Sequence, residues 1–365
     1  MTIAVFAPEI HEPFIEGIQK SAWAAVSAAG GRGDRFLVFT QHSYGGDVPA
    51  SPHATVLPWI SSFPSRPLKY LLWISNAVRI AREIRRRDVR GIAAFSLDWS
   101  FILPLALARL LCPRIPLCVA IFSLRDAGFV QRLFFAVFGG KSVSYSVRSL
   151  FMRDRLMALG IPSDRIATFV WSAGLRRAAP PPSASDESYP RTVLYLSSAD
   201  SGAGADAVLD AARALPDCRF RLAIRDFGRR GARAFSCLER RIMAGNLPNV
   251  LLERNIDVPA ALSCAGAVVL PPRSERDTMD MPLVLLESFS ARVPAIVSGT
   301  PAFADLSRRG YVLAYGAESG LPDAIRTAIG RDDAVIAMLD RAGLFADSLP
   351  GASDAAREYF SFGRI

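Results

Sequence analysis

The segment 267–298 constrains the fold of this chain more than any other. It contains two short apolar runs, Ala267–Leu270 and Ala295–Ser298, which have the length and composition of buried strands. Between them lie a polar loop and an apolar helix that begins at Pro282 and carries one charged residue, Glu287. Two buried strands joined through a helix pair in parallel, because the helix returns the chain to the edge where the first strand began. The segment therefore predicts an α/β protein with parallel sheets.

The start of this helix has two features of an anion-binding site. Pro282 lacks an N–H and suits the first helical position, so the amides of Leu283 and Val284 have no acceptor within the helix. Free amides and the positive end of the helix dipole together favour a phosphate. Glu287, little more than one turn further along, supplies a carboxylate for ribose hydroxyls. The alternative is an amphipathic helix whose one carboxylate is solvated.

The run 282–289, PLVLLESF, with 293–298, VPAIVS, after it resembles the E-x7-E region of retaining glycosyltransferases of the GT-B fold, family 4 (glycosyl transferases group 1). The resemblance implies that Glu287 matches the second glutamate, which binds the ribose of a nucleotide sugar. It also implies that the amides of Leu283 and Val284, at the helix start, hold the distal phosphate of that donor.

Two departures from the family pattern mark a divergent member. The position of the first glutamate holds Met279, and Asp280 beside it is the nearest carboxylate that can contact the donor sugar. In the family, a loop early in the C-terminal domain carries two cations that clamp the diphosphate, and those positions hold Ser198 and Ala203 here. A leaving diphosphate needs its developing charge stabilised. If this protein is catalytic, a cation from another part of the chain must therefore take the place of the two missing ones.

Three arginines at predicted strand ends are candidates for that cation. Arg225 ends one predicted strand, and Arg273 and Arg276 lie in the loop before the helix that carries Glu287. The alternative for each is a solvated side chain in a surface loop. Arg254 ends a further predicted strand, whose end loop we expect to meet the nucleotide base.

The N-terminal half opens with a β-α-β pattern whose loops follow the predicted strands. Open α/β sheets bind their ligands at such carboxyl ends, so we assign His11, Asp98 and Asp126 to an acceptor side. The alternative is again solvated loop residues. In the family the first loop is glycine-rich and approaches the donor phosphate, and Gly17 is the nearest match here. The phrase 160–166, GIPSDRI, resembles the end of the N-terminal domain in this superfamily.

A polar run rich in proline and serine, residues 178–190, divides the chain. At 365 residues the chain is long enough for two cores. We predict an N-terminal, acceptor-side domain over 1–177 and a C-terminal, nucleotide-sugar-binding domain over 191–365. The resemblance implies two Rossmann-like domains facing across a cleft, with the final helix crossing back onto the first domain.

Composition argues against several classes of protein. The five cysteines are scattered without metal-ligand spacing and there are only three histidines, so we expect no metal and no cofactor. There is no zinc-finger, helix-turn-helix or RNP-like signature, which argues against nucleic acid. The start of the chain lacks the pattern of a signal peptide, and no apolar run reaches about 18 residues. We therefore expect a cytoplasmic protein.

The net charge of +9 comes almost entirely from arginine, and five arginines crowd one end of the predicted helix 67–87. This helix is either an amphipathic surface helix packed on the sheet or a basic helix that rests on anionic lipid. The second interpretation makes an anionic membrane surface a partner, with the protein peripheral on its inner face.

Together these patterns predict a retaining glycosyltransferase that moves a sugar from a nucleotide-diphosphate donor to a glycan, a lipid-linked or another small acceptor. The resemblance implies a metal-independent mechanism, in which the donor phosphate assists departure and the acceptor hydroxyl attacks from the same face. Two alternatives stay open. One is a pseudo-enzyme that acts as a nucleotide-sugar-binding subunit, and the other is a sugar-nucleotide epimerase of the same fold.

Overall fold

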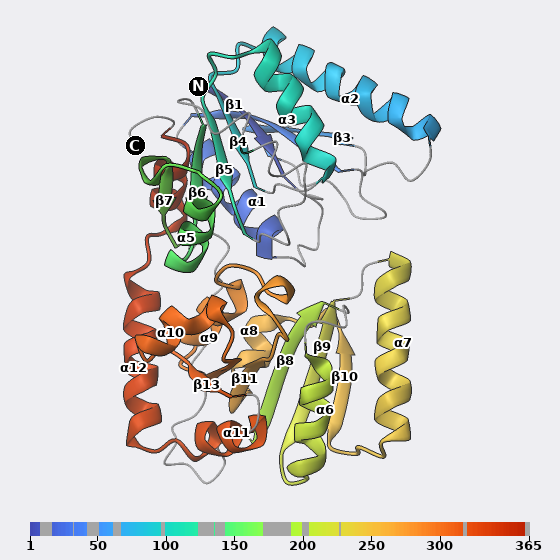
Figure 1. Ribbon diagram of the computed structural model, residues 1–365, viewed down its shortest axis with the longest axis vertical. Helices are drawn as coiled ribbons and strands as arrows, with labels where there is room; N and C mark the ends of the chain where they lie inside the picture. The colour runs from blue at the N-terminus through green and yellow to red at the C-terminus, as the bar shows by residue number, and fades with distance from the viewer. Residues whose placement is uncertain are drawn as a thin grey trace. The chain divides into compact units, whose positions relative to one another are not determined.

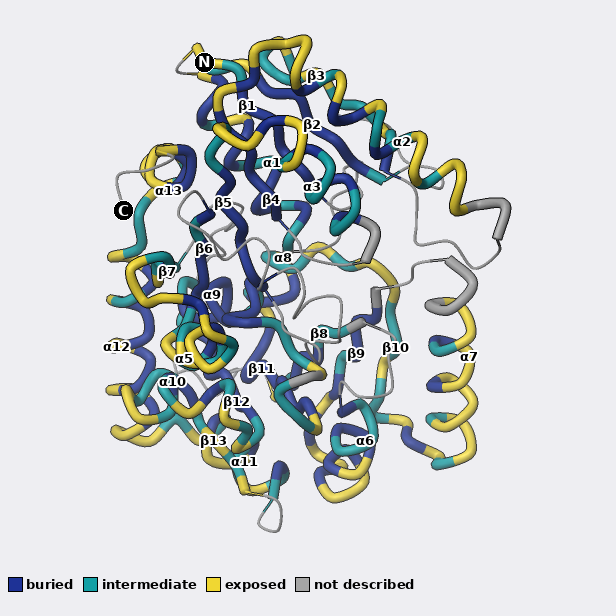
Figure 2. The backbone as a smooth tube through the Cα atoms, turned by 45° about the horizontal axis from the view of Figure 1, so that its top comes forward, coloured by how far each residue is buried: buried dark blue, intermediate teal, exposed yellow. Residues whose placement is uncertain are grey.

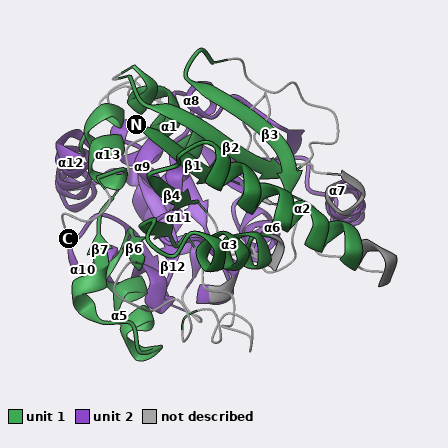
Figure 3. Cartoon of the chain, turned by 90° about the horizontal axis from the view of Figure 1, so that it is seen from above, with its two compact units in different colours: residues 1–174, 350–365 green, residues 175–349 purple. Residues whose placement is uncertain are grey.

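The computed structural model divides into two compact units, shown in Figures 1 and 3. Unit 1 comprises residues 1–174 and 350–365, and unit 2 comprises residues 175–349. The structure describes residues 1–7, 17–31, 33–41, 51–60, 67–95, 99–122, 135, 143–170, 191–198, 204–225, 228–316 and 320–361. The predicted linker, 178–190, lies outside these residues.

Unit 1 is built on a seven-stranded parallel sheet with the order β3-β2-β1-β4-β5-β6-β7. Its strands are β1 (Thr2–Phe6), β2 (Arg35–Gln41), β3 (Ala54–Ile60), β4 (Gly91–Ala94), β5 (Leu117–Ala120), β6 (Val143–Val147) and β7 (Ile166–Thr168). The chain moves outward from β1 to β3 and then returns to the other side of β1 at β4. The strand order therefore reverses between β1 and β4.

Helices cover both faces of this sheet. They are α1 (Gly17–Gly30), α2 (Pro67–Arg86), α3 (Trp99–Leu111), α5 (Leu150–Ala158) and α13 (Ala352–Tyr359), with the 3-10 turn η1 (Ser163–Arg165). On one face α2 packs against α3, and buried Ile80 and Ile84 of α2 join the core beneath Phe6 and Phe39. On the other face α1 packs against α13. The alternating side chains of each strand fill both layers, which is why β1 is apolar and buried from Ile3 to Phe6.

The C-terminal helix α13 is fixed to unit 1 by buried aromatic residues. The Tyr359 hydroxyl donates a hydrogen bond to the carbonyl of Ala94 at 2.9 Å and lies 3.5 Å from that of Cys118. The Tyr359 ring lies 4.9 Å from Phe95, measured between ring centroids, and the ring of Phe360 lies 5.2 Å from that of Phe36. These contacts explain why 350–365 belongs to unit 1 although it follows unit 2 in the chain.

Unit 2 contains a six-stranded parallel sheet with the order β10-β9-β8-β11-β12-β13. Its strands are β8 (Thr192–Ser198), β9 (Arg219–Arg225), β10 (Val250–Arg254), β11 (Ala267–Leu270), β12 (Ala295–Ser298) and β13 (Leu313–Tyr315). Its helices are α6 (Ala205–Ala214), α7 (Gly228–Ala244), α8 (Val258–Leu262), α9 (Leu283–Ser290), α10 (Ala304–Arg308), α11 (Leu321–Gly330) and α12 (Asp333–Ser348), with η3 (Glu275–Asp277) and η4 (Pro301–Phe303). The predicted strand–loop–helix–strand segment is β11, α9 and β12.

We expect Tyr359→Phe to lower the free energy of unfolding of unit 1 by about 1–2 kcal/mol, because it removes a hydrogen bond between buried groups. All five tryptophans of the chain lie in unit 1, so urea unfolding followed by their fluorescence measures this unit. Tyr145→Phe is the matched control. The Tyr145 hydroxyl is also buried in unit 1, but it has no hydrogen-bond partner among the described residues. Equal losses in the two variants would contradict the assigned role of Tyr359.

Candidate functional site

The carboxyl ends of β8 and β11 meet where the strand order of unit 2 reverses. From β8 the chain builds β9 and β10 on one side, and then β11, β12 and β13 on the other. Such a reversal leaves a crevice outside the strand ends, where open α/β sheets bind ligands. The end of β12 is tied to the loop after β11, because the hydroxyl of Ser298, the last residue of β12, donates to the carbonyl of Pro272 at 2.8 Å. The start of α6, next to β8, borders the same place.

Gly204 brings the start of α6 directly against the loop after β11. It is the N-cap of α6 and has a left-handed backbone, with φ 85° and ψ 20°. A Cβ atom at this position would lie 1.8 Å from the carbonyl oxygen of Pro271. Only glycine fits both the backbone conformation and this contact. The two loops at the strand reversal are therefore in van der Waals contact through their backbones.

An ion-pair cluster, formed by Asp206, Arg241 and Arg273, lies beside this contact. Asp206, in the first turn of α6, pairs with Arg241 of α7 and with Arg273 of the loop after β11. Burial raises the pKa of the nearby Tyr195 hydroxyl to about 12, a hydrogen bond with Ser197 opposes this shift, and the charge of Asp206 adds to it. Arg273, a predicted cation for the diphosphate, is thus held next to the start of α6.

Sequence reasoning missed the partners of Arg273. An acidic residue in the first turn of a helix, such as Asp206, is common because it complements the helix dipole, so it gives no sign of a distant ion pair. Asp206 and Arg273 are 67 positions apart in the chain. Only the contact between the two loops reveals that they meet.

For the other two predicted cations, Arg225 and Arg276, the structure describes the position of the backbone. Arg225 ends β9 and pairs in register with Ser198 at the end of β8, so both lie at the carboxyl edge of the sheet. Arg276 lies in η3, within the loop after β11. The side chains of Arg225, Ser198 and Arg276 are outside the described part of the structure.

The start of α9 differs from the prediction by one residue. Pro282 is the N-cap, with φ −55° and ψ 138°, and the helix begins at Leu283. The prediction that Pro282 occupies the first helical position is therefore wrong, because an extended ψ ends the loop at this residue. Leu283 and Val284 are the first two helical positions, whose amides have no acceptor within a helix. The Leu285 amide donates to the carbonyl of Pro282 at 3.0 Å.

The residue before this proline has an uncommon backbone conformation. Met281 has a φ of 49° and is 7% exposed. A side chain other than glycine is strained in this region, and such strain persists only where the surroundings hold it. The turn directs the chain from Asp280 into α9, and no residue in the sequence signals it.

Glu287 and Asp280 are buried carboxylates. They are 2% and 4% exposed, respectively. The alternative of a solvated Glu287 is therefore wrong: α9 buries most of its side chains, and its Phe289 packs against Tyr311 and Phe345. A buried carboxylate is costly unless other groups compensate its charge, so both residues belong to a polar environment inside unit 2.

Of the remaining predicted residues, the structure describes Arg254 and Gly17. Arg254 ends β10, the edge strand, and its guanidinium lies over the ring of Phe235, 3.9 Å from the ring centroid. Gly17 begins α1 in unit 1. His11, Asp98 and Asp126 are outside the described residues. The first two belong to segments that follow β1 and β4, the strands between which the order of unit 1 reverses.

The described residues contain neither a metal-ligand cluster nor a membrane-spanning helix. No group of three or more histidines, cysteines or acidic residues is arranged to hold a metal ion in the ranges that the structure describes. In the same ranges, no helix is both long enough and apolar enough to cross a membrane.

No family model and no curated protein matches this sequence. Solved structures match it over nearly the full length. Sucrose-phosphate synthase from Thermosynechococcus elongatus has a TM-score of 0.79 at 15% identity, covering 100% of this chain and 98% of that chain. Anabaena HepE, solved in complex with UDP-glucose, has a TM-score of 0.73 at 14% identity, covering 99% and 98%. The glycosyltransferase WaaG, involved in lipopolysaccharide biosynthesis, has a TM-score of 0.65 at 16% identity, covering 100% of both chains.

The chain has the GT-B fold. The predicted class, α/β with two Rossmann-like domains, is confirmed by the two parallel sheets and by these matches. Within the GT-B fold of this chain, the strand reversal of unit 2 brings together α6, α9 and the loop after β11.

We expect Gly204→Ala to loosen this part of the GT-B fold, because the added methyl group collides with the backbone of Pro271. Hydrogen exchange of the β8 and β11 amides measures the effect, and protection should fall by about 1–3 kcal/mol. Gly310→Ala is the control in the same unit. Gly310 also has a positive φ, but its Cβ would meet only the flexible side chain of Arg341. If both variants show the same protection of these amides, the close approach of the two loops does not stabilise this part of the fold.

Proposed function

We propose that this protein is a glycosyltransferase that uses a nucleotide-diphosphate sugar as its donor. The observation that carries the proposal is the buried carboxylate of Glu287, placed one turn after the amides of Leu283 and Val284, which begin α9. A phosphate suits those amides, and a carboxylate at that distance suits the hydroxyls of a ribose. Anabaena HepE, which shares the fold, has been solved with UDP and with UDP-glucose.

The donor roles follow from this arrangement. The amides of Leu283 and Val284, at the helix start that Pro282 caps, bind the distal phosphate, and Glu287 binds the ribose. Asp280, buried beside the strained turn at Met281, contacts the donor sugar. Ser198 and Arg254, at the ends of β8 and β10, contact the rest of the nucleotide, and Gly17 takes part in binding the donor phosphates.

The reaction we propose retains the configuration of the sugar and uses no metal. The acceptor hydroxyl attacks the anomeric carbon from the face that the diphosphate leaves. The bond between that carbon and the phosphate oxygen breaks, and the departing phosphate takes the hydroxyl proton. Negative charge then grows on the diphosphate, and Arg273, Arg225 and Arg276 are the cations that stabilise it.

The acceptor is a glycan, a lipid-linked or another small molecule with a free hydroxyl. His11, Asp98 and Asp126 belong to its side of the site, in unit 1. We place the protein in the cytoplasm and at the inner face of a membrane, because α2 combines exposed apolar and basic side chains in the manner of an interfacial helix.

A second candidate function is a pseudo-enzyme that binds nucleotide sugars without transferring them. The ion pair between Arg273 and Asp206 favours the pseudo-enzyme, because an arginine already paired with a carboxylate is less able to stabilise the charge of a leaving group. A diphosphate that binds Arg273 must therefore compete with Asp206 for this side chain. Turnover measurements separate the two functions.

The first test concerns Glu287. We expect Glu287→Gln to weaken the binding of UDP-glucose by about 2–4 kcal/mol, because it removes charge-assisted hydrogen bonds while it preserves the size of a buried side chain. Titration calorimetry measures the affinity, and circular dichroism checks the fold. Glu239→Gln, on the exposed face of α7, is the control and should bind as the unmodified protein does. Unchanged affinity in a folded Glu287 variant would show that this residue does not hold the donor.

The second test concerns the cation. We expect alanine in place of at least one of Arg225, Arg273 and Arg276 to lower turnover about 100-fold, while donor affinity falls less, because the charge develops only as the bond breaks. Arg213→Ala is the matched control for Arg273→Ala, since Arg213 also pairs with an aspartate of α6, Asp210.

Three outcomes of this test have separate meanings. Full turnover in all three variants would mean that the diphosphate lies elsewhere. Donor binding without turnover, with any acceptor extract, would establish the pseudo-enzyme. Donor consumption in the absence of any acceptor would indicate a sugar-nucleotide epimerase instead.

A further inference from the structure

Asp206 is shared between two arginines that come from different elements of unit 2. It lies in the first turn of α6, and its carboxylate pairs with Arg241 of α7 and with Arg273 of the loop after β11. These partners are 35 and 67 positions away from it in the chain. The three residues meet beside the close contact between Gly204 and Pro271. The tertiary fold of unit 2, and not one helix, therefore brings them together.

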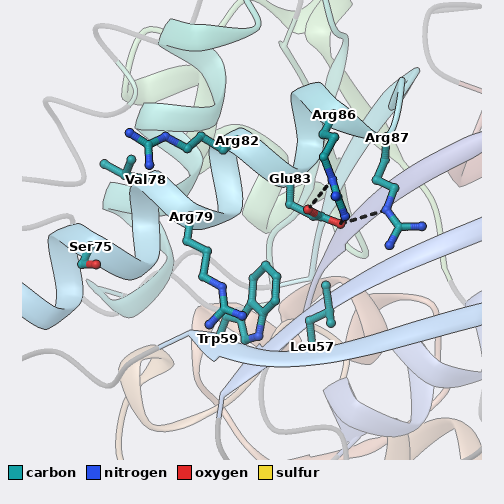
Figure 4. Close-up of a pocket in the computed structure, with 9 residues that line it drawn as sticks. All are labelled: Leu57, Trp59, Ser75, Val78, Arg79, Arg82, Glu83, Arg86 and Arg87. Atoms are coloured by element: carbon teal, nitrogen blue, oxygen red, sulfur yellow. Dashed lines mark hydrogen bonds and ion pairs between the residues drawn. The ribbon is translucent and has the colours of Figure 1, made fainter.

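A carboxylate of unit 1 is also shared between two arginines, but by neighbours in the sequence. Glu83 of α2 accepts hydrogen bonds from Arg87 at 2.8 Å and from Arg86 at 3.2 Å, and Figure 4 shows the three side chains together. The two arginines follow Glu83 by four and three positions, a spacing that brings side chains together on any helix surface. No such local spacing accounts for the two partners of Asp206.

The cluster of Asp206, Arg241 and Arg273 has one positive charge in excess, because two guanidinium groups share a single carboxylate. The three side chains are 39%, 45% and 60% exposed, respectively. Figure 2 shows α7, which carries Arg241, as mostly exposed. An anion from solvent can therefore reach the cluster and is attracted by its excess charge.

The second arginine makes it easier for Asp206 to release the first. If Asp206 were paired with Arg273 alone, the transfer of Arg273 to an anion would leave an unpaired carboxylate beside that anion. The two like charges would then repel each other and oppose the transfer. With Arg241 present, the carboxylate keeps a partner when Arg273 leaves it. The ion pair between Arg273 and Asp206 therefore does not by itself keep Arg273 from a diphosphate.

From these observations we infer that Asp206 and Arg241 are positioning residues for Arg273, which they hold at the start of α6 and release to a diphosphate. The diphosphate displaces the carboxylate from Arg273, and Arg241 then keeps the ion pair with Asp206. Arginine suits this exchange, because its donor fork matches the oxygens of a carboxylate and those of a phosphate. The inference rests on the proposed function for the source of the diphosphate, which is a nucleotide sugar.

The first test measures the affinity of the full chain for inorganic diphosphate by titration calorimetry. Asp206→Asn should raise this affinity about fivefold, because it removes the carboxylate that competes for Arg273. The loss of a merely structural ion pair would lower the affinity instead. Arg241→Gln should lower it about fivefold, because Arg273 then stays with Asp206. Arg240→Gln, the same charge change at the exposed neighbouring position of α7, is the control and should change the affinity by less than about twofold.

Two double variants test whether Arg241 acts through Arg273. Arg273→Gln/Arg241→Gln should bind diphosphate as Arg273→Gln alone does, because Arg241 then has no side chain to position. Asp206→Asn/Arg241→Gln should recover the affinity of the unmodified protein, because Arg273 is no longer held by a carboxylate. Additive losses at Arg241 and Arg273, or no recovery in the second double variant, would overturn the inference.

Kinetics with UDP-glucose and an acceptor extract separate this inference from the proposed function. Arg241→Gln should lower kcat about fivefold and change the KM for the donor by less than about twofold, because the charge on the diphosphate develops only as the bond breaks. An unchanged kcat in this variant would overturn the inference and leave the proposed function standing, whereas absence of diphosphate binding to the unmodified protein would overturn the inference outright. The expected diphosphate affinities without any binding of UDP-glucose would refute the proposed donor and leave the exchange of Arg273 standing.

Discussion

The contact between Gly204 and the backbone of Pro271 is the constraint on which the candidate site depends. It lets the start of α6 approach the loop after β11 more closely than any side chain would permit. As a result, Asp206 reaches Arg273. A wider separation would leave the two loops solvated and independent. The close approach of these two loops therefore depends on a packing contact rather than on a charged residue.

The second element of the candidate site is a pair of buried carboxylates, one within the apolar helix α9 and one just before it. Glu287 and Asp280 are almost fully buried, although α9 is otherwise packed by aliphatic and aromatic side chains. Burying carboxylates lowers stability unless they are bonded, so a fold that needed only packing would favour apolar residues there. The strained φ of Met281 adds a further cost at the same turn. Such a local loss of stability is typical of a ligand-binding site.

Unit 1 uses arginine in a different way. In unit 2, Asp206 pairs with both Arg241 and Arg273. In unit 1, Glu83 pairs with Arg86 and Arg87, and no carboxylate among the described residues pairs with Arg79 or Arg82. The same residue type therefore forms an exposed ion-pair cluster in one unit and an open basic surface in the other. The difference lies in the neighbouring carboxylates and not in the arginines themselves.

The sequence by itself determined the fold class and the central segment of unit 2. Short apolar runs separated by a helix are local patterns, so β11, α9 and β12 were found from composition and spacing. The helix α2 and its basic end were found in the same way. The proposed anion site at the start of α9 followed from the position of Pro282. The helix begins one residue later than predicted, because the φ of proline suits both an N-cap and a first helical position.

Only the tertiary structure decided which distant residues meet. The pairing of Asp206 with Arg273, the burial of Glu287 and the return of α13 to unit 1 join segments far apart in the chain. Hydrophobic periodicity reports which face of an element is buried, but not which element covers it. Strand order, and with it the place where the loops of β8 and β11 converge, depends on packing between elements. For that reason the residues of the candidate site could be predicted from the sequence, whereas their arrangement could not.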